Sequence, residues 1–318
     1  MKKFQDKKVS ALFQIDPIVK LNKNSDSTLA IIKEGFNFGV DTWIGFPQDV
    51  SLKKNLIHMR AQKVLDSDFN LGDPKEVKIN KYDFFFIRQD PPFNLRYLTN
   101  CYILEIHKKF NKKPLFINNP TGIKNFTEKI FPLYFYDFMP KTYLSEDVNF
   151  FLSLLKKHKS LVLKTLFNKG GEGVERVNQS NKNEAVTIFT NLIKKYSVPI
   201  IIQEYIHSVK FGDKRVILLD GNPVGAINRV PREGEFKANL HLGGKAEITD
   251  LTNNEKKICQ SLKKILTREG LFFVGIDLIN EKLTEINVTS PTGIVQIEDL
   301  TGIKIAKKFW IKLIKKIN

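Results

Sequence analysis

Three side chains that carry oxygen atoms, Asp277, Glu285 and Asn287, stand at a spacing that could bind a metal ion. Asp277 belongs to an apolar run over residues 271–279, and the other two belong to a second run over 283–288. A short polar turn separates the runs, which predicts a β-hairpin. Residues two apart in a strand share a face, so we expect Glu285 and Asn287 side by side with Asp277 opposite. Such oxygens suit Mg²⁺, although an edge hairpin with a solvated polar face would show the same pattern.

A lysine followed by glycines forms the second candidate group. Lys164 ends a short apolar stretch, and glycines follow at 170, 171 and 173. Small residues in a turn let backbone N–H groups approach phosphate oxygens. The stretch lacks the GK[ST] of a P-loop and the third glycine of a dinucleotide fingerprint, so by itself a plain hairpin turn explains it equally well. The candidate phosphate ligands are Lys164, Gly170, Gly171 and Gly173.

Polar residues further along could bind the rest of a nucleotide. Residues 200–206 (IIIQEYI) form a strand whose polar end could hydrogen-bond an adenine between apolar walls, or simply a central strand with one wet end. Asp213 could hold ribose hydroxyls beside Lys214 and Arg215. Cations that follow could stabilise charge that develops on phosphate or on a tetrahedral oxyanion. The remaining candidates are Gln203, Glu204, Tyr205, Ile206, Arg229, Arg232, Lys237 and Asn239.

Length and composition bound the class of protein. The 318 residues predict two or three domains, and a 42% hydrophobic, 27% charged chain is globular. No run approaches the ~20 apolar residues of a spanning helix. A polar N-terminus and only two cysteines, Cys101 and Cys259, favour the cytoplasm. The net charge of +17 could attract nucleic acid, lipid or small anions. Because the lysines are scattered and no nucleic-acid motif occurs, we expect neither a nucleic-acid nor a membrane partner.

The hydrophobic pattern predicts the elements that position these residues. It indicates a parallel α/β domain, then a small α+β unit, and then a region rich in strands. The polar segment 230–246 is long for a loop and predicts a mobile lid. A terminal helix at 303–317 carries six lysines and is expected to pack on a domain. Further helices are expected at 25–35, 95–110, 126–135 (with Lys129), 147–158, 182–195 and 253–269, and further strands at 9–15, 39–44, 82–87, 114–118, 141–144, 161–164, 174–177, 199–205, 214–219 and 223–229.

Taken in order, the lysines, the glycine-rich turn, the adenine-type strand and D-x(7)-E-x-N resemble the ATP-grasp ligase superfamily. In detail, RQDPPF at 88–93, GDKRV at 212–216, NLHLGG at 239–244 and LTEINVTSPTG at 283–293 resemble bacterial glutathione synthetases. The likeness runs from Asp16 almost to the C-terminus. It implies a three-part ATP-grasp fold of the α/β and α+β classes, with an N-terminal parallel α/β domain (1–122), a small central lid domain (123–202) and a C-terminal mixed-sheet catalytic domain (203–318).

The resemblance also implies an activity and a role for each residue. ATP, with Mg²⁺ or alternatively Mn²⁺, would phosphorylate γ-glutamylcysteine, and glycine would attack the acyl phosphate to give glutathione in the cytoplasm. No protein nucleophile is required, and the family suggests a homotetramer or dimer. Arg229 and Arg215 would be catalytic. ATP would contact Lys129, Lys164, Gly170, Gly171, Gly173, Gln203, Glu204, Tyr205, Ile206, Asp213 and Lys214; the metal would contact Asp277, Glu285 and Asn287; and the substrates would contact Arg88, Lys237, Asn239, Ser290, Thr292 and Gly293.

Some positions depart from the family pattern. Residues 163–171 read LKTLFNKGG where these enzymes usually read LKPLDGxGG or LKPLYGxGG. Lys237 replaces an arginine, which keeps the charge and loses bidentate geometry. Val295 and Gln296 replace an Arg-Glu pair. These changes leave two alternatives open: a related carboxylate–amine ligase with another donor or acceptor, and a nucleotide-binding homologue without turnover.

Overall fold

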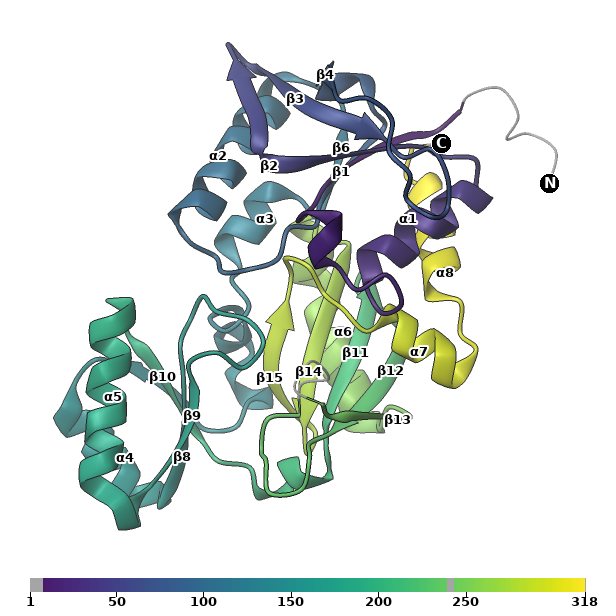
Figure 1. Cartoon of the computed structure of the whole chain (residues 1–318). Helices are drawn as coiled ribbons and strands as arrows, with labels where there is room; N and C mark the ends of the chain where they lie inside the picture. Colours follow the sequence, from purple (N-terminus) through teal and green to yellow (C-terminus); the bar gives the residue numbers. More distant parts are fainter. Residues whose placement is uncertain (1–7, 239–242, 318) are drawn as a thin grey trace.

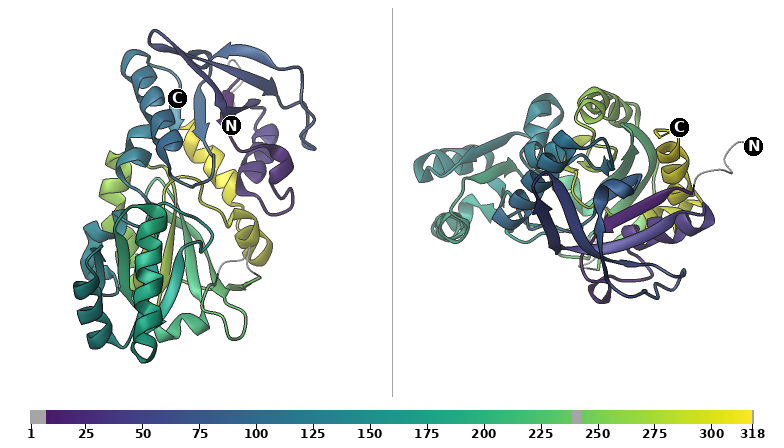
Figure 2. Two further views of the ribbon diagram at one scale, coloured as in Figure 1. Left: turned by 60° about the vertical axis from the view of Figure 1, so that its left-hand side comes forward. Right: turned by 90° about the horizontal axis from the view of Figure 1, so that it is seen from above.

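Three β-sheets follow one another along the chain in the computed structural model, which describes residues 8–238 and 243–317. They contain six, four and five strands. In Figure 1 the first sheet lies at the top, the second at the lower left and the third at the lower right. Figure 2 shows the same three parts from two other directions. The succession agrees with the expected order of domains, while the boundaries at residues 122 and 202 stay predictions.

The N-terminal sheet combines a parallel part with an antiparallel edge. The parallel part was predicted, whereas the two antiparallel strands were not, because their charged residues conceal the apolar alternation. Its strands are β1 (Ser10–Gln14), β2 (Asp41–Lys53), β3 (Leu56–Lys63), β4 (Lys75–Lys78), β5 (Phe84–Ile87) and β6 (Leu115–Ile117), and its helices are α1 (Ser27–Asn37), α2 (Leu95–Phe110) and α3 (Pro120–Asn125).

The strand order of this sheet, β4-β3-β2-β1-β5-β6, places β1 at its centre. β1 is parallel to β2 and β5, and β5 is parallel to β6. The carboxyl ends of β1 and β5 therefore lie side by side, and the loops that follow them carry Asp16 and Arg88. Ligands of α/β sheets bind at such ends. Asp26 caps α1 by accepting hydrogen bonds from the Thr28 and Leu29 amides.

The central sheet is a small antiparallel unit covered on one side by two helices (Figure 1). Its strand order is β7-β10-β8-β9, and the stacked rings of Phe151 and Phe189, 4.5 Å apart, form its core. A chain of short 3-10 turns at Phe131–Phe138 precedes it. The elements are β7 (Thr142–Ser145), α4 (Val148–His158), β8 (Ser160–Lys164), β9 (Val174–Asn178), α5 (Lys182–Tyr196) and β10 (Ile200–Glu204).

Lys129 lies in a turn, so the predicted helix at 126–135 is wrong in its start. The helical stretch begins at Phe131 instead. Pro132 explains the late start, because a proline lacks the N–H that a helix interior needs and is tolerated in the first helical turn. The lysine thus projects from a turn between two domains.

The C-terminal sheet has the order β13-β12-β11-β14-β15, and each of its pairings among the described residues is antiparallel. The expected mixed sheet is therefore antiparallel. The predicted hairpin is confirmed, with Asp277 directly opposite Glu285. The elements are β11 (Asp213–Leu219), β12 (Asn222–Val230), β13 (Lys245–Ile248), α6 (Asn253–Arg268), β14 (Phe273–Ile279), β15 (Lys282–Asn287), α7 (Ile294–Thr301) and α8 (Ile305–Ile314).

The last helix packs against the N-terminal domain as well as against the third sheet, where its Phe309 meets Phe273. α8 lies beside α1, and the Trp310 indole N–H donates to the Ile31 carbonyl at 2.8 Å. Its fully buried ring meets Phe84 and Phe86 of the N-terminal sheet. The predicted packing role of this helix is confirmed, and the N-terminal core is completed by the end of the chain.

A single side chain also joins the first sheet to the third. The Asn118 amide donates to the carbonyls of Phe273 and Val288, both at 2.7 Å, and its oxygen accepts from the Phe273 amide. Among the residues that the structure describes, we find no helix with the length and apolar character needed to span a bilayer.

Candidate active site

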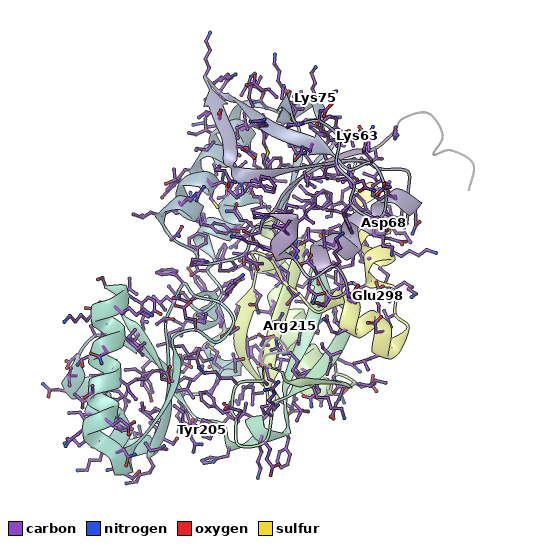
Figure 3. The ribbon with its side chains drawn as sticks, viewed as in Figure 1. Lys63, Asp68, Lys75, Tyr205, Arg215 and Glu298 are labelled. Carbon is purple, nitrogen blue, oxygen red and sulfur yellow. The ribbon has the colours of Figure 1, made fainter. Side chains whose placement is uncertain are left out.

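A cavity lies between the central and C-terminal sheets, and most of the predicted nucleotide residues line it. The empty space between its walls, counted together with its open mouth, is about 990 Å³. Tyr205 and Arg215, labelled in Figure 3, both belong to its wall. The wall also includes Lys129, Lys164, Gly170, Gly171, Gln203, Glu204, Ile206, Asp213, Arg229, Lys237, Asp277, Glu285 and Asn287.

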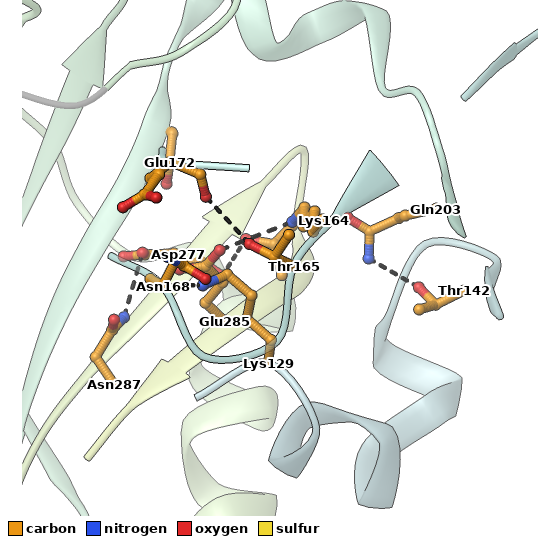
Figure 4. A network of polar contacts seen from close by, with 12 residues as sticks. Lys129, Thr142, Lys164, Thr165, Asn168, Glu172, Gln203, Asp277, Glu285 and Asn287 are labelled. Atoms are coloured by element: carbon orange, nitrogen blue, oxygen red, sulfur yellow. Dashed lines mark hydrogen bonds and ion pairs between the residues drawn. The ribbon is translucent and has the colours of Figure 1, made fainter. Parts of the chain in front are cut away.

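Two buried lysines supply positive charge to this cavity (Figure 4). Lys164, at the end of β8, is 8% exposed, and its Nζ lies 3.9 Å from Glu285 Oε1. Burial lowers the pKa of Lys164, and the nearby Glu285 opposes that effect. Lys129 is 4% exposed and donates to the Asn168 carbonyl at 2.5 Å. Buried ammonium groups with unused N–H donors are well suited to phosphate oxygens.

The glycine-rich turn (residues 165–173) stands above these lysines. Gly170, Gly171 and Gly173 all have positive φ, which favours glycine. The Thr165 N–H donates to the Gly173 carbonyl at 3.0 Å, and a Cβ on Gly173 would lie 2.3 Å from the Thr165 hydroxyl oxygen. Gly173 itself does not line the cavity, and it closes the turn that presents Gly170 and Gly171.

The other end of the cavity is apolar. Val162 and Val174 come from the central sheet, and Val209 and Ile279 come from the C-terminal domain. These four side chains form walls on which a flat heterocycle could lie, at the end of β10 where Gln203 to Ile206 stand. The Gln203 amide N–H donates to the Thr142 hydroxyl at 2.8 Å, so its position is fixed (Figure 4).

A buried cluster of two arginines and two aspartates forms the floor. Arg215 donates to Asp277 through Nε and Nη2, and Arg229 Nη2 lies 2.6 Å from Asp213 and 3.0 Å from Asp277. Burial raises the pKa of Asp213 to about 6. Burial opposes ionisation of Asp277 as well, yet the two arginines overcome it and lower its pKa. The cluster holds two guanidinium groups in fixed positions at the cavity, where two carboxylates balance their charge.

The residues expected to hold a metal lie together on the hairpin. Asp277 faces Glu285 across β14 and β15, and Asn287 Nδ2 lies 3.3 Å from Asp277 Oδ2 (Figure 4). Because Asn287 Nδ2 donates to Asp277 and to the Gly275 carbonyl, the carbonyl oxygen of Asn287 is the atom that could bind a metal. The donor set is all oxygen, so it fits Mg²⁺. Within residues 8–238 and 243–317, no cluster of three or more His, Cys, Asp and Glu side chains suitable for a metal occurs; this set has two carboxylates and an amide.

Several predicted substrate residues lie next to the cavity instead of in its wall. Arg88 is buried, donates through Nη2 to the Pro291 carbonyl at 3.0 Å, and has no partner for Nη1 within the described part of the chain. Ser290 donates to the Arg88 carbonyl, and Arg215 Nη1 donates to the Thr292 carbonyl at 3.1 Å. The Gly293 amide donates to the Ser27 hydroxyl. Residues 290–293 thus connect the two arginines.

One predicted nucleotide residue points away from the cavity. Lys214 points to the opposite face of β11, where it pairs with Glu255 of α6 at 2.7 Å. Because strand residues alternate, Asp213 and Arg215 can reach the cavity only if Lys214 does not, so its assignment to ATP is corrected here. Asn239 lies outside the described residues.

Glu128 lines the cavity although the sequence analysis did not select it. Its Oε1 accepts from the Thr289 hydroxyl at 2.5 Å, and its carbonyl accepts from the Ile286 amide at 3.0 Å. Burial raises its pKa. The one sequence feature that could have selected Glu128 is its position next to Lys129.

Comparison with known families identifies the family to which the chain belongs. The family model for the ATP-grasp domain of prokaryotic glutathione synthetase matches residues 128–302, and the model for the N-terminal domain of the same enzyme matches residues 9–124. The chain belongs to the prokaryotic glutathione synthetase family. A glutathione synthetase of Rhodopseudomonas palustris is 39% identical over 93% of this chain and 95% of its own length. One from Agrobacterium fabrum is 36% identical over 95% of each chain.

Solved structures show that this member of the glutathione synthetase family has the ATP-grasp fold. A D-cycloserine synthetase aligns with a TM-score of 0.69 at 15% identity, over 97% of this chain and all of its own. An ATP-grasp ligase crystallised with Mg and ADP aligns with a TM-score of 0.64 at 12% identity, over 98% of this chain and 99% of its own. The predicted three-part fold is confirmed.

Proposed function

We propose that the protein is a glutathione synthetase: it joins γ-glutamylcysteine to glycine at the expense of ATP and releases glutathione, ADP and phosphate. The observation that carries this proposal is a cavity in which two buried lysines, two buried arginines and the hairpin carboxylates converge. It adjoins Arg88, whose Nη1 is buried and unpaired among the residues described. The family to which the chain belongs has the same activity by name.

In this proposal the nucleotide lies along the cavity from end to end. The base rests between the valine and isoleucine walls at the end of β10, and the Asp213 carboxylate accepts ribose hydroxyls. Lys129 and Lys164 bind the phosphates under the glycine-rich turn. An Asp213 oxygen that has no partner in the described structure supports the ribose assignment.

Glu285, Asn287 and Asp277 would hold Mg²⁺, with Mn²⁺ as a substitute, and the ion would neutralise phosphate charge during transfer. Asp277 is already shared between Arg215 and Arg229, so these arginines and the cation compete for its lone pairs. Release of Arg229 from Asp277 would leave its guanidinium available for the reacting group.

Two displacements account for the reaction. A terminal carboxylate oxygen of γ-glutamylcysteine attacks the γ-phosphorus, and ADP leaves with the electrons of the broken P–O bond. The neutral amine of glycine then attacks the acyl carbonyl, the C–O bond to phosphate breaks, and the amide forms as one amine proton leaves with the phosphate. Arg229 and Arg215 would stabilise the negative charge in both steps. Arg88 and Lys237, with Ser290, Thr292 and Gly293, would bind the substrates.

The remaining parts of the proposal concern where and how the enzyme works. We place the reaction in the cytoplasm, in keeping with two buried, unbridged cysteines, and in a homotetramer or dimer. Small molecules are its only proposed partners.

Phosphate release tests the proposal directly. The full-length protein is incubated with ATP, Mg²⁺, γ-glutamylcysteine and glycine, and each component is then omitted in turn. We expect turnover only with all four, and glutathione equal in amount to phosphate. Turnover that persists without γ-glutamylcysteine or glycine would assign a different donor or acceptor, and binding of ATP without any turnover would identify a nucleotide-binding homologue.

A further inference from the structure

Three consecutive residues of the glycine-rich turn contact two distant segments, the loop 88–93 and the turn that carries Lys129. The Phe167 carbonyl accepts from the Phe93 amide at 2.9 Å, and the two rings lie 6.3 Å apart. The Asn168 carbonyl accepts from Lys129 Nζ. The Lys169 ammonium forms an ion pair with Asp90. Phe167 and Asn168 depart from the usual family pattern, and Lys169 adds a charge at its variable position, so the contacts of side chains 167 and 169 depend on this chain's own residues.

The partner loop of this turn belongs to the substrate side. Residues 88–93 follow β5 and begin with Arg88, whose guanidinium is held to the Pro291 carbonyl. Two residues later, the Asp90 amide donates to Asp16 Oδ2 at 2.8 Å, at the end of the neighbouring strand β1. Asp90 therefore has a fixed backbone and directs its carboxylate at Lys169. One rigid loop carries both the proposed peptide contact and the anchor of the turn.

Two hydrogen bonds within the central domain close the turn. The Thr165 N–H and hydroxyl donate to the Gly173 and Glu172 carbonyls. A proline at 165, usual in the family, would lack that N–H. A shift of Lys169 must therefore move the Asn168 carbonyl, which holds the ammonium of Lys129. Asp90, Lys169, Asn168 and Lys129 form a continuous path from the substrate loop to a phosphate ligand.

We propose that Lys169 and Asp90 are positioning residues that couple the binding of γ-glutamylcysteine to the binding of nucleotide. The inference rests on the proposed function. A peptide bound at Arg88 shifts the loop 88–93 as a unit, the ion pair carries this shift to the turn over the phosphates, and Lys129 is reoriented toward them. By thermodynamic reciprocity, nucleotide must favour the peptide by the same factor.

The ion pair is half exposed, with 50% of the Lys169 side chain and 33% of the Asp90 side chain accessible. Such a pair contributes little by itself in water. We therefore expect a modest coupling, in which γ-glutamylcysteine strengthens the binding of a non-hydrolysable ATP analogue by about three- to tenfold.

Calorimetric titration measures this coupling. The Mg²⁺ complex of the analogue is titrated into the wild type, Lys169→Met, Asp90→Asn, the double variant and the charge-exchanged Lys169→Asp/Asp90→Lys variant, each with and without γ-glutamylcysteine. We expect the affinity ratio to fall to about one in both single variants, to fall no further in the double variant, and to return in the exchanged variant. Lys195→Met is the matched control, since Lys195 lies 3.8 Å from Glu172 of the same turn and should leave the ratio unchanged.

The outcomes of these titrations distinguish failure of the proposed function from failure of the proposed coupling. If γ-glutamylcysteine does not bind the wild type, with or without the analogue, the proposed function fails and the inference with it. If γ-glutamylcysteine binds but does not change the affinity of the wild type for the analogue, the proposed coupling through Lys169 and Asp90 is overturned. The same holds if the affinity ratio is unchanged in Lys169→Met. In both cases the proposed function stands. Loss of the ratio in Lys195→Met, or its absence from the exchanged variant, would also overturn the specific pairing.

Discussion

Asp277 has one neighbour that the sequence predicted and two partners that it did not. Spacing along the hairpin predicted the pairing of Asp277 with Glu285, because strand periodicity fixes which side chains face each other. The two arginines that occupy Asp277 come from β11 and β12, and no local pattern connects them to it. The assignment of Lys214 to ATP was wrong for a related reason. The matched block GDKRV runs along a strand, so its residues alternate between the two faces and cannot all reach the cavity. Glu128 was missed because one acid beside a lysine is an ordinary surface pattern.

Replacing Glu285 with Gln should abolish turnover while leaving the fold intact. The substitution keeps the size of the side chain and removes the charge that faces Lys164 and would face Mg²⁺. We expect kcat/KM to fall by at least about 100-fold, with thermal unfolding close to that of the wild type. Glu281→Gln, in the exposed turn of the same hairpin, is the control and should retain activity. Near-normal turnover in Glu285→Gln would contradict the metal assignment.

Replacing Glu128 with Gln should change how stability depends on pH. Burial raises the pKa of Glu128 above its ordinary 4.5, so the folded protein binds this proton more tightly than the unfolded chain. The stabilisation is present below the ordinary pKa and is lost as pH rises through the folded value. Gln can still accept from Thr289 and never ionises. The variant should therefore gain melting temperature relative to the wild type as pH rises from about 4 to 7, and a constant difference would contradict this account.

At the scale of elements, the sequence predicted those with a clear apolar period and missed those without. The helix at Leu95–Phe110 was predicted with both of its ends. Strand β3 was missed because basic residues interrupt it, and helix α7 because it directly follows the glycine at 293 with no capping side chain. The placement of the cavity was out of reach, since it depends on how the second and third sheets approach each other.

Gly173→Ala should damage the nucleotide site more than the backbone strain alone explains. Gly173 has φ of +67°, and an added Cβ would meet the Thr165 side chain at 2.3 Å. Gly302 has φ of +71° with no atom within 4 Å of such a Cβ, so Gly302→Ala isolates the strain of about 1–2 kcal/mol. We expect about tenfold weaker binding of an ATP analogue in Gly173→Ala only. Equal affinities in the two variants would argue against the turn as a phosphate cradle.

At the scale of the whole molecule, the last helix of the chain packs against the first sheet. Trp310 of the last helix is buried against β5 of the first sheet. Trp310→Ala should lower the free energy of unfolding by about 3–5 kcal/mol, through lost contacts and a cavity. Its neighbour Ile311 is 40% exposed, and Ile311→Ala should cost less than about 1 kcal/mol. Urea unfolding measures both, and similar losses would contradict the role of Trp310 in the N-terminal core.

The same helix determines when the N-terminal core can be completed during synthesis on the ribosome. Synthesis proceeds at about 5–20 residues per second, so the nearly 200 residues between β6 and α8 delay completion of the first core by roughly 10–40 seconds. During that interval Phe84 and Phe86 lack the cover that Trp310 later provides. The nascent N-terminal region therefore exposes this aromatic face until the last helix leaves the exit tunnel.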